Sequence, residues 1–243
     1  MLISTMDAEE VALEVKRDYQ KLADTTIMRL GEEYERERKK YKISRERAYT
    51  KVYTVKTARK NNWIIVIGKS PSAEIYTNRS HLNYEAVTYY WDDEGLKVLQ
   101  WRGKGVLQIY KGHVFTRYNM RMKLGLDKPV DIIKHYFMHN RYCCGDSIIK
   151  KPGIYFIGFA KDGLLLGQAG FIPGKEKEQD VLIWRTFVSR DLIRHHQEKK
   201  EKARIKEMEQ EALKSLVEKK DHGTSYLSQV NVLKVLTGKY DIH

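Results

Sequence analysis

One histidine and two arginines recur at intervals of four residues in the segment 112–122: His113, Arg117 and Arg121. Residues four apart are neighbours on a helix, so these side chains form one row, and His113 lies in the opening turn beside unbonded backbone N–H groups. A histidine can transfer protons near neutral pH, and an arginine can hold a phosphate through two parallel hydrogen bonds. The spacing therefore predicts a phosphate site.

The chemistry that suits this row is metal-independent cleavage of RNA. RNA carries its own nucleophile, the 2′-hydroxyl, so an acid–base histidine and cations that stabilise the transition-state charge are sufficient. We therefore take His113, Arg117, Arg121 and Thr186 as the candidate catalytic residues, with Thr186 or Ser189 assisting in positioning the substrate and with no cofactor. The alternative is a basic row that pairs with carboxylates or only keeps the domain soluble.

A second candidate anion site lies where an expected strand meets an expected helix, in the segment 184–190. Ser189 can cap that helix, and a helix N-terminus with a hydroxyl and two arginines nearby attracts anions. The alternative is that Ser189 is only a cap. With cations of the preceding strands and turns, this segment supplies the residues predicted to bind nucleic acid: Arg102, Lys104, Lys111, Arg185, Ser189 and Arg190.

Two further histidines, His135 and His139, are also four residues apart, and the thiolate of Cys143 lies one helical turn further. Such a set can bind Zn²⁺. Asn140 and Gly145 indicate, however, that the helix ends before the cysteine, and paired histidines at the edge of an apolar face are usually packing residues. The metal site is therefore the minor alternative.

Aromatic residues are interspersed with cations in the segment 84–111. Exposed rings on a basic sheet can stack unpaired bases. Side chains alternate between the two faces of a strand, so only about half of these rings can share one face, and the others must form core. The rings concerned are Tyr84, Tyr89, Tyr90, Trp91, Trp101 and Tyr110.

The net charge of +13 is concentrated in residues 44–151, which hold 20 lysines and arginines against 9 acidic residues, or +11. Nucleic acid is the commonest partner of such a positive field, and an anionic membrane is the next. No apolar run approaches the roughly 18 residues that cross a bilayer. Because residues 1–7 lack the features of a secretory signal and the only cysteines are Cys143 and Cys144, we expect a cytoplasmic protein that does not bind a membrane.

The hydrophobic pattern predicts helices, then a mainly antiparallel sheet interrupted by helices, then helices again. Asp7 and Glu10 open the first helix as a capping box, and Gly31 ends or weakens it. A second helix is expected from Ser44 to about Lys60. Strands are expected at 63–67, 86–91, 96–101, 106–110, 154–160, 164–169 and 181–188. Further helices are expected at 112–122, 129–140, 190–219 and 226–236.

These elements predict an α+β fold whose mainly antiparallel sheet contains five to six of these strands, arranged as a meander and hairpins, with helices on one face. We expect an N-terminal helical extension (1–62), an α+β core domain (63–189) and a C-terminal helical extension (190–243). The sequence contains no Walker or dinucleotide loop and no nucleophile elbow. The architecture is similar, at the level of fold class alone, to compact metal-independent ribonucleases such as barnase and the RelE-like toxins.

The sequence thus predicts a protein that binds nucleic acid, RNA or single strands, and a candidate metal-independent endoribonuclease. The alternative is a non-enzymatic interaction or structural protein, such as a viral or mobile-element component, whose charged helices dock on protein partners. It is motivated by the charged segments 32–42 and 197–204, which are costly to keep ordered alone. In that hypothesis the C-terminal helix binds a partner protein or mediates self-association.

Overall fold

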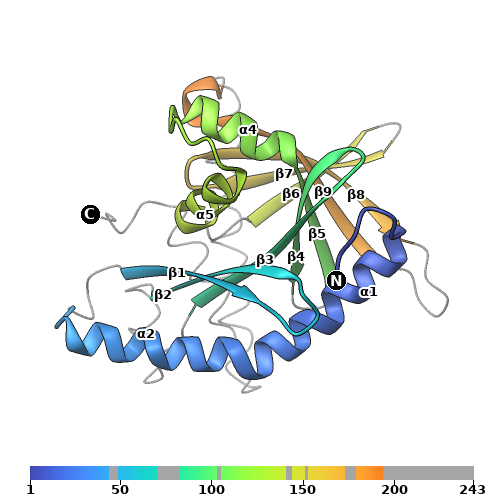
Figure 1. The fold of residues 1–243 in the computed structure, drawn as a ribbon. Coiled ribbons are helices and arrows are strands. Elements are labelled where there is room, and N and C mark those ends of the chain that lie inside the picture. The colour runs from blue at the N-terminus through green and yellow to red at the C-terminus, as the bar shows by residue number, and fades with distance from the viewer. Residues whose placement is uncertain are drawn as a thin grey trace, which may run out of the picture.

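A computed structural model describes residues 1–43, 49–69, 83–102, 105–140, 144–150, 153–172 and 179–193, and Figure 1 shows the fold. The described helices and strands are, in chain order, α1 (Ala8–Lys21), the π-helical turn η1 (Leu22–Ile27), α2 (Met28–Lys40), β1 (Tyr49–Lys56), β2 (Asn62–Lys69), β3 (Asn83–Asp92), β4 (Gly95–Arg102), β5 (Val106–Lys111), α4 (Gly112–Arg121), α5 (Pro129–His139), β6 (Cys144–Lys150), β7 (Gly153–Ala160), β8 (Gly163–Ile172), β9 (Gln179–Ser189) and the 3₁₀ turn η3 (Arg190–Leu192).

The described strands form one nine-stranded sheet in the order β1-β2-β3-β4-β5-β9-β8-β7-β6. Neighbouring strands are antiparallel except β5 and β9, which run parallel. The parallel pairing joins two meanders, β1 to β5 and β6 to β9. Parallel strands need a long crossover connection, and α4 and α5 lie in this one. The fold is therefore α+β, but the expected five to six strands are too few.

Helices cover both faces of the sheet, and not one face as the sequence predicted (Figure 1). The reason lies in the continuous apolar run of β2. Trp63, Ile65 and Ile67 lie in one core and Ile64 and Val66 in the other, and all five are at most 1% exposed. A strand that is apolar on both faces needs a covering layer on each. The helices α1 and α2 form one layer, and α4 and α5 form the other.

The N-terminal helix begins as predicted and continues beyond its predicted end. The Asp7 carboxylate accepts from the Glu10 N–H at 2.9 Å, and the Glu10 carboxylate accepts from the Asp7 N–H at 3.0 Å. Gly31 does not end the helix, because η1 leads from α1 into α2 and Gly31 is buried within α2. Packing on the sheet outweighs the low helix propensity of one glycine. The side chains that pack are Val11, Val15, Leu22, Ile27, Leu30 and Tyr34.

The expected helix from Ser44 to about residue 60 is wrong, because residues 49–56 form the edge strand β1. Tyrosine, valine and threonine fill most of this segment, and these residues favour strands. Successive side chains contribute to opposite cores, Val52 to the core under α4 and α5 and Tyr53 to the core under α1 and α2. The predicted domain boundary at residue 62 falls at the start of β2, which pairs with β1. Ser44 itself lies outside the described residues.

Most other expected elements are confirmed as β2 to β5, α4, α5 and β7 to β9. Strand β6 was not predicted. At Ser189 the sequence predicts a long helix, but residues 190–192 form one 3₁₀ turn without a side-chain cap from Ser189. The rest of the expected C-terminal helices, including the segment 197–204, lies outside the described residues. The charged segment 32–42 mostly belongs to α2, which packs on the sheet.

A buried carboxylate fixes α1 to the sheet. Asp18, which is 1% exposed, accepts hydrogen bonds from the Trp63 indole at 2.7 Å, the Thr57 hydroxyl at 2.8 Å and the Asn61 amide at 2.8 Å. A carboxylate in an apolar layer is stable only when donors match its lone pairs. The three donors come from β2 and the turn that precedes it, so Asp18 determines where α1 sits on the sheet.

Replacing Asp18 with alanine leaves these three donors without their acceptor, and each loss costs about 1–3 kcal/mol. We expect Asp18→Ala to lower the free energy of unfolding by at least about 3 kcal/mol in urea denaturation. Asp7→Ala, at the exposed cap of the same helix, is the matched control and should cost about 1 kcal/mol. Equal losses in the two variants would contradict the anchoring role of Asp18.

Glu14 lies one turn before Asp18 and pairs with Arg59. Hydrogen bonds from Arg59 lower the pKa of Glu14 from 4.5 to about 2, although burial opposes this shift. Because the folded pKa is depressed, the pair stabilises the protein above pH 4.5, and this contribution disappears as the pH falls from 4.5 to about 2. We expect the free energy of unfolding, measured at constant salt, to fall across this window. The fall should be smaller in Glu14→Gln, and an identical fall would refute the assignment.

Candidate functional site

Helix α4 presents the predicted row at the border of its buried face. His113 is exposed, and Arg117 and Arg121 are half-buried. The helix packs on β9 and α5, and its buried residues are Val114, Phe115 and Tyr118. Gly112 allows the helix to start close to β4, because a Cβ there would lie 3.1 Å from both the Cβ and the carbonyl oxygen of Leu96. The glycine therefore positions the first turn, and with it His113.

The first two residues of the row are in contact. Nε of Arg117 donates a hydrogen bond to Nε2 of His113 at 3.0 Å. A guanidinium always carries its protons, so the accepting nitrogen must present a lone pair, and the hydrogen bond assigns the His113 proton to Nδ1. In this arrangement His113 is a hydrogen-bond donor through Nδ1, and its basic nitrogen is already occupied.

Arg121 continues the row and lies near both Arg117 and Asp191. Burial and the positive charge of Arg117 lower the pKa of Arg121, and the Asp191 carboxylate opposes this shift. Nη1 of Arg121 is buried and has no hydrogen-bond partner among the described residues. Within the described part of the chain, neither guanidinium of the row forms an ion pair with a carboxylate. The row therefore keeps two cations that have no ion-pair partner among the described residues.

Acidic residues are missing from a wider segment that contains α4. Residues 95–126 hold seven lysines and arginines and no aspartate or glutamate. Outside α4, some of these cations pair with carboxylates from β3 and the β3–β4 turn: Arg102 with Glu85 at 3.0 Å and Lys111 with Glu94 at 3.1 Å. The alternative in which basic residues merely neutralise carboxylates thus describes Arg102 and Lys111, but not the arginines of α4.

A β-bulge places Thr186 away from the row. One residue of β9, Arg185, has no partner in the register with β8, and such a bulge reverses the alternation of side chains. Trp184 and Phe187, on either side of the bulge, therefore both lie in the core beneath α4. Thr186 lies on the other face of the sheet. The structure does not bring Thr186 together with His113.

The remaining residues predicted to bind nucleic acid have varied surroundings. Ser189 is buried and Arg185 is exposed. Nε of Arg190 donates to the Lys161 carbonyl at 2.7 Å, so Arg190 ties the end of β9 to the β7–β8 turn. Lys104 lies outside the described residues. The residue after Arg190, Asp191, lies near the row, because its carboxylate raises the pKa of Arg121.

The two histidines of α5 do not converge on a common point. The rings of His135 and His139 stack at a centroid distance of 4.3 Å and an interplanar angle of 12°. Burial and the neighbouring His139 lower the pKa of His135, and Asp162 opposes this shift. Cys143, the third predicted ligand, lies outside the described residues. Among the described side chains, no three His, Cys, Asp or Glu residues gather as a metal site requires.

A polar cluster that the sequence did not reveal joins α4, α5 and the β7–β8 turn. Oη of Tyr118 donates to the Asp162 carboxylate at 2.8 Å and lies 3.0 Å from Nδ1 of His135. The Asn140 amide donates to the same carboxylate at 2.9 Å and accepts from the Asp162 N–H at 2.9 Å. In the sequence Tyr118 fits an apolar helix face and Asp162 fits a hairpin turn. Neither residue therefore signals a site.

One aromatic side chain near the row is exposed. Trp91 of β3 is 50% exposed and is paired with Leu96 of β4, the residue against which Gly112 packs. Its neighbour on the same face, Tyr89, packs with the core beneath α4 and α5. The centroids of the Tyr89 and Trp91 rings are 5.6 Å apart, and the rings meet edge to face. Trp91 therefore lies on the sheet face that carries α4, near the start of that helix.

No family model matches this chain, and neither the curated proteins nor the solved structures include a significant match. In the described residues, no helix has the length and apolar character needed to cross a bilayer. The geometry around α4 is therefore the basis on which a function can be argued.

Proposed function

We propose that the protein binds nucleic acid, RNA or other single strands, by holding phosphate groups with Arg117 and Arg121. One observation supports this most directly: the two cations lie close enough for Arg117 to lower the pKa of Arg121, and no described carboxylate pairs with either. An unsatisfied N–H of Arg121 adds about 1–3 kcal/mol of cost. A phosphate between the arginines supplies both the missing negative charge and the missing acceptors.

A polymer of phosphates suits this surface better than a single anion. The segment 95–126 holds seven cations and no acidic residue, and the larger segment 44–151 has a net charge of 20 − 9 = +11. Each phosphate that these cations neutralise releases counterions, which favours binding of a polyanion. Two adjacent cysteines fit a reducing compartment, where RNA is present.

Single strands are favoured over duplexes because of Trp91. An exposed ring near one end of a row of cations can stack an unpaired base while the cations hold the backbone. His113 lies at the same end and, with its proton on Nδ1, can donate a hydrogen bond to a phosphate oxygen. Bases in a duplex are already stacked and offer no free face to the ring.

Cleavage of the bound strand is a second candidate function, which requires a reaction in addition to binding. The arginines favour it as well. Guanidiniums that hold a phosphate in the ground state also stabilise the additional charge of the transition state. His113 is poorly suited to remove a proton, because Arg117 occupies its basic nitrogen. The role of His113 is therefore to bind and orient the phosphate.

Replacing both arginines tests the binding. We expect Arg117→Ala/Arg121→Ala to bind a fluorescent single-stranded RNA at least about 10-fold more weakly, since two charge-assisted bonds are lost. The slope of the logarithm of affinity against the logarithm of salt concentration should fall by about 1–2 units. Fluorescence anisotropy over a salt series measures both quantities.

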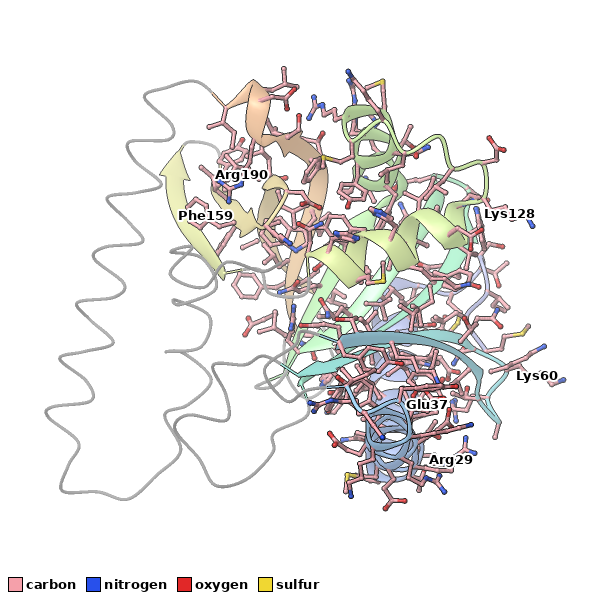
Figure 2. The ribbon with its side chains drawn as sticks, turned by 90° about the vertical axis from the view of Figure 1, so that its left-hand side faces the viewer. Arg29, Glu37, Lys60, Lys128, Phe159 and Arg190 are labelled. Atoms are coloured by element: carbon pink, nitrogen blue, oxygen red, sulfur yellow. The ribbon has the colours of Figure 1, made fainter. Side chains whose placement is uncertain are left out.

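The matched control is Arg17→Ala/Arg29→Ala, which removes two exposed arginines from the N-terminal helices. Figure 2 shows Arg29 on the side of the sheet opposite to the labelled Arg190 and Lys128. This control should keep most of the affinity. Equal loss in the two double variants would show that only net charge matters, and would overturn the site on α4.

Trp91→Ala tests the stacking. Stacking of one base on an aromatic ring contributes about 1–3 kcal/mol, so affinity for the single strand should fall about 5-fold or more. Affinity for a duplex of the same length should change little, because its bases are not free to stack. The measurement is anisotropy with both ligands. Trp101→Ala is not a suitable control because its ring is partly buried, whereas Tyr41→Ala removes an exposed ring from the other layer.

A further inference from the structure

Tyr118 connects the row of arginines to a histidine of α5. It is fully buried, and it lies on α4 directly after Arg117 and three residues before Arg121. Its hydroxyl oxygen lies 2.8 Å from the Asp162 carboxylate and 3.0 Å from Nδ1 of His135. One residue therefore contacts two titratable groups from different elements, beneath the helix that carries the cations.

The cluster is continuous with the end of β9. In Figure 2, α5 runs from the labelled Lys128 toward Arg190. The Arg190 N–H donates to the Asp162 carbonyl at 3.3 Å. The carboxylate of the next residue, Asp191, raises the pKa of Arg121. Tyr118 and Arg121 thus both lie in the C-terminal half of α4, and each interacts with an acidic residue of the segments that the Arg190–Asp162 hydrogen bond joins.

The protons of the cluster have one consistent arrangement. An ionised carboxylate only accepts, so Tyr118 donates its proton to Asp162. The tyrosine oxygen then accepts from Nδ1–H of His135, which leaves the basic lone pair of His135 on Nε2. No described residue donates to that nitrogen. His113 has the opposite arrangement, because its Nε2 accepts from Arg117.

We propose that His135 is the acid–base residue that acts on a phosphodiester held by Arg117 and Arg121, with Tyr118 and Asp162 as its positioning residues. The role of His135 rests on the proposed function, because it requires a bound strand. An acid–base histidine needs one nitrogen fixed by a partner and a second nitrogen that can take a proton; Tyr118 fixes Nδ1 of His135, and no described residue donates to Nε2. Burial and the adjacent His139 also lower its pKa, which favours the unprotonated form at neutral pH.

The reaction that fits these groups is transfer of the phosphodiester of RNA to its own 2′-oxygen. Nε2 of His135 takes the proton of the 2′-hydroxyl, the oxygen forms a bond to phosphorus, and the bond from phosphorus to the 5′ oxygen breaks. The products are a 2′,3′-cyclic phosphate and a 5′-hydroxyl. The leaving oxygen takes its proton from water, and the imidazolium of His135 returns a proton to the resulting hydroxide. The arginines stabilise the charge that develops on the phosphate oxygens.

The test uses the full chain and an end-labelled single-stranded RNA in EDTA, with binding followed by anisotropy and cleavage by gel electrophoresis. We expect His135→Gln to bind RNA as the wild type does and to cleave it at least about 100-fold more slowly, because acid–base groups contribute about 10²–10⁴-fold. His113→Gln should mainly weaken binding. A DNA strand of the same sequence should bind without cleavage, since it lacks the 2′-hydroxyl.

Two further variants separate positioning from stability. Tyr118→Phe should reduce the cleavage rate, and Tyr34→Phe, which removes a buried hydroxyl on the other side of the sheet, is its matched control. The charged and titratable groups that face His135 are Tyr118 on α4, His139 on α5 and Asp162 in the β7–β8 turn. The Asp162 charge raises the pKa of His135, so in Asp162→Asn the rise of cleavage with pH should move to lower pH. A merely structural role would lower the rate at every pH without moving that rise.

The outcomes distinguish the two proposals. A wild type that binds RNA and leaves it intact overturns the role of His135 and leaves the binding function standing. Cleavage that survives in His135→Gln but is lost in His113→Gln also overturns it, as does equal cleavage of the DNA strand. A wild type that binds no RNA overturns the proposed function, and the role of His135 with it.

Discussion

Strand β2 carries large apolar side chains on both of its faces, so the sheet needs one helical layer under Trp63 and another over Ile64 and Val66. Burial of each such side chain contributes about 1.5–3 kcal/mol, which is enough to determine where amphipathic helices bind. The lower layer consists of α1 and α2, and the hydrogen bonds from three donors to Asp18 hold it on the sheet. The upper layer consists of α4 and α5. Every described helix of two turns or more takes its position from this requirement.

The upper layer also explains why the row of α4 is charged and yet held in place. A helix buries only one stripe, so the border residues are fixed by the backbone without being covered. Some cations near α4 are neutralised, as with Arg102 and Lys111 and their carboxylate partners. Arg117 and Arg121 remain without such partners among the described residues, although like charges repel at this separation. A surface that keeps this cost is more typical of a binding site than of a solubilising surface.

Local signals in the sequence were sufficient for elements with strong ends or turns. The capping box at Asp7, the turns at Asp92–Gly95 and 161–163, and the helix at Pro129 were all predicted. Strand β1 was missed because Ser44 fits a helix cap and Asn61–Asn62 fit a helix end, and these end signals were given more weight than the β-branched residues between them. The face on which Thr186 lies depends on a bulge, and a bulge has no sequence signature here. Of the candidate site, the sequence predicted the row but not its neighbours, because Tyr118 and Asp162 are 44 residues apart.

Tyr118 belongs to the core and to the polar cluster at the same time, and this dual role links the stability of the fold to the site. Its ring contacts Tyr136 at 5.0 Å and Phe187 at 5.2 Å, both edge to face. These contacts leave the ring little freedom, so packing determines where the hydroxyl points, and the hydroxyl in turn determines the orientation of His135. A histidine held by loop residues alone would lose rotamer entropy on each binding event. Here that entropy is lost on folding, so the folded protein itself sets the orientation of His135.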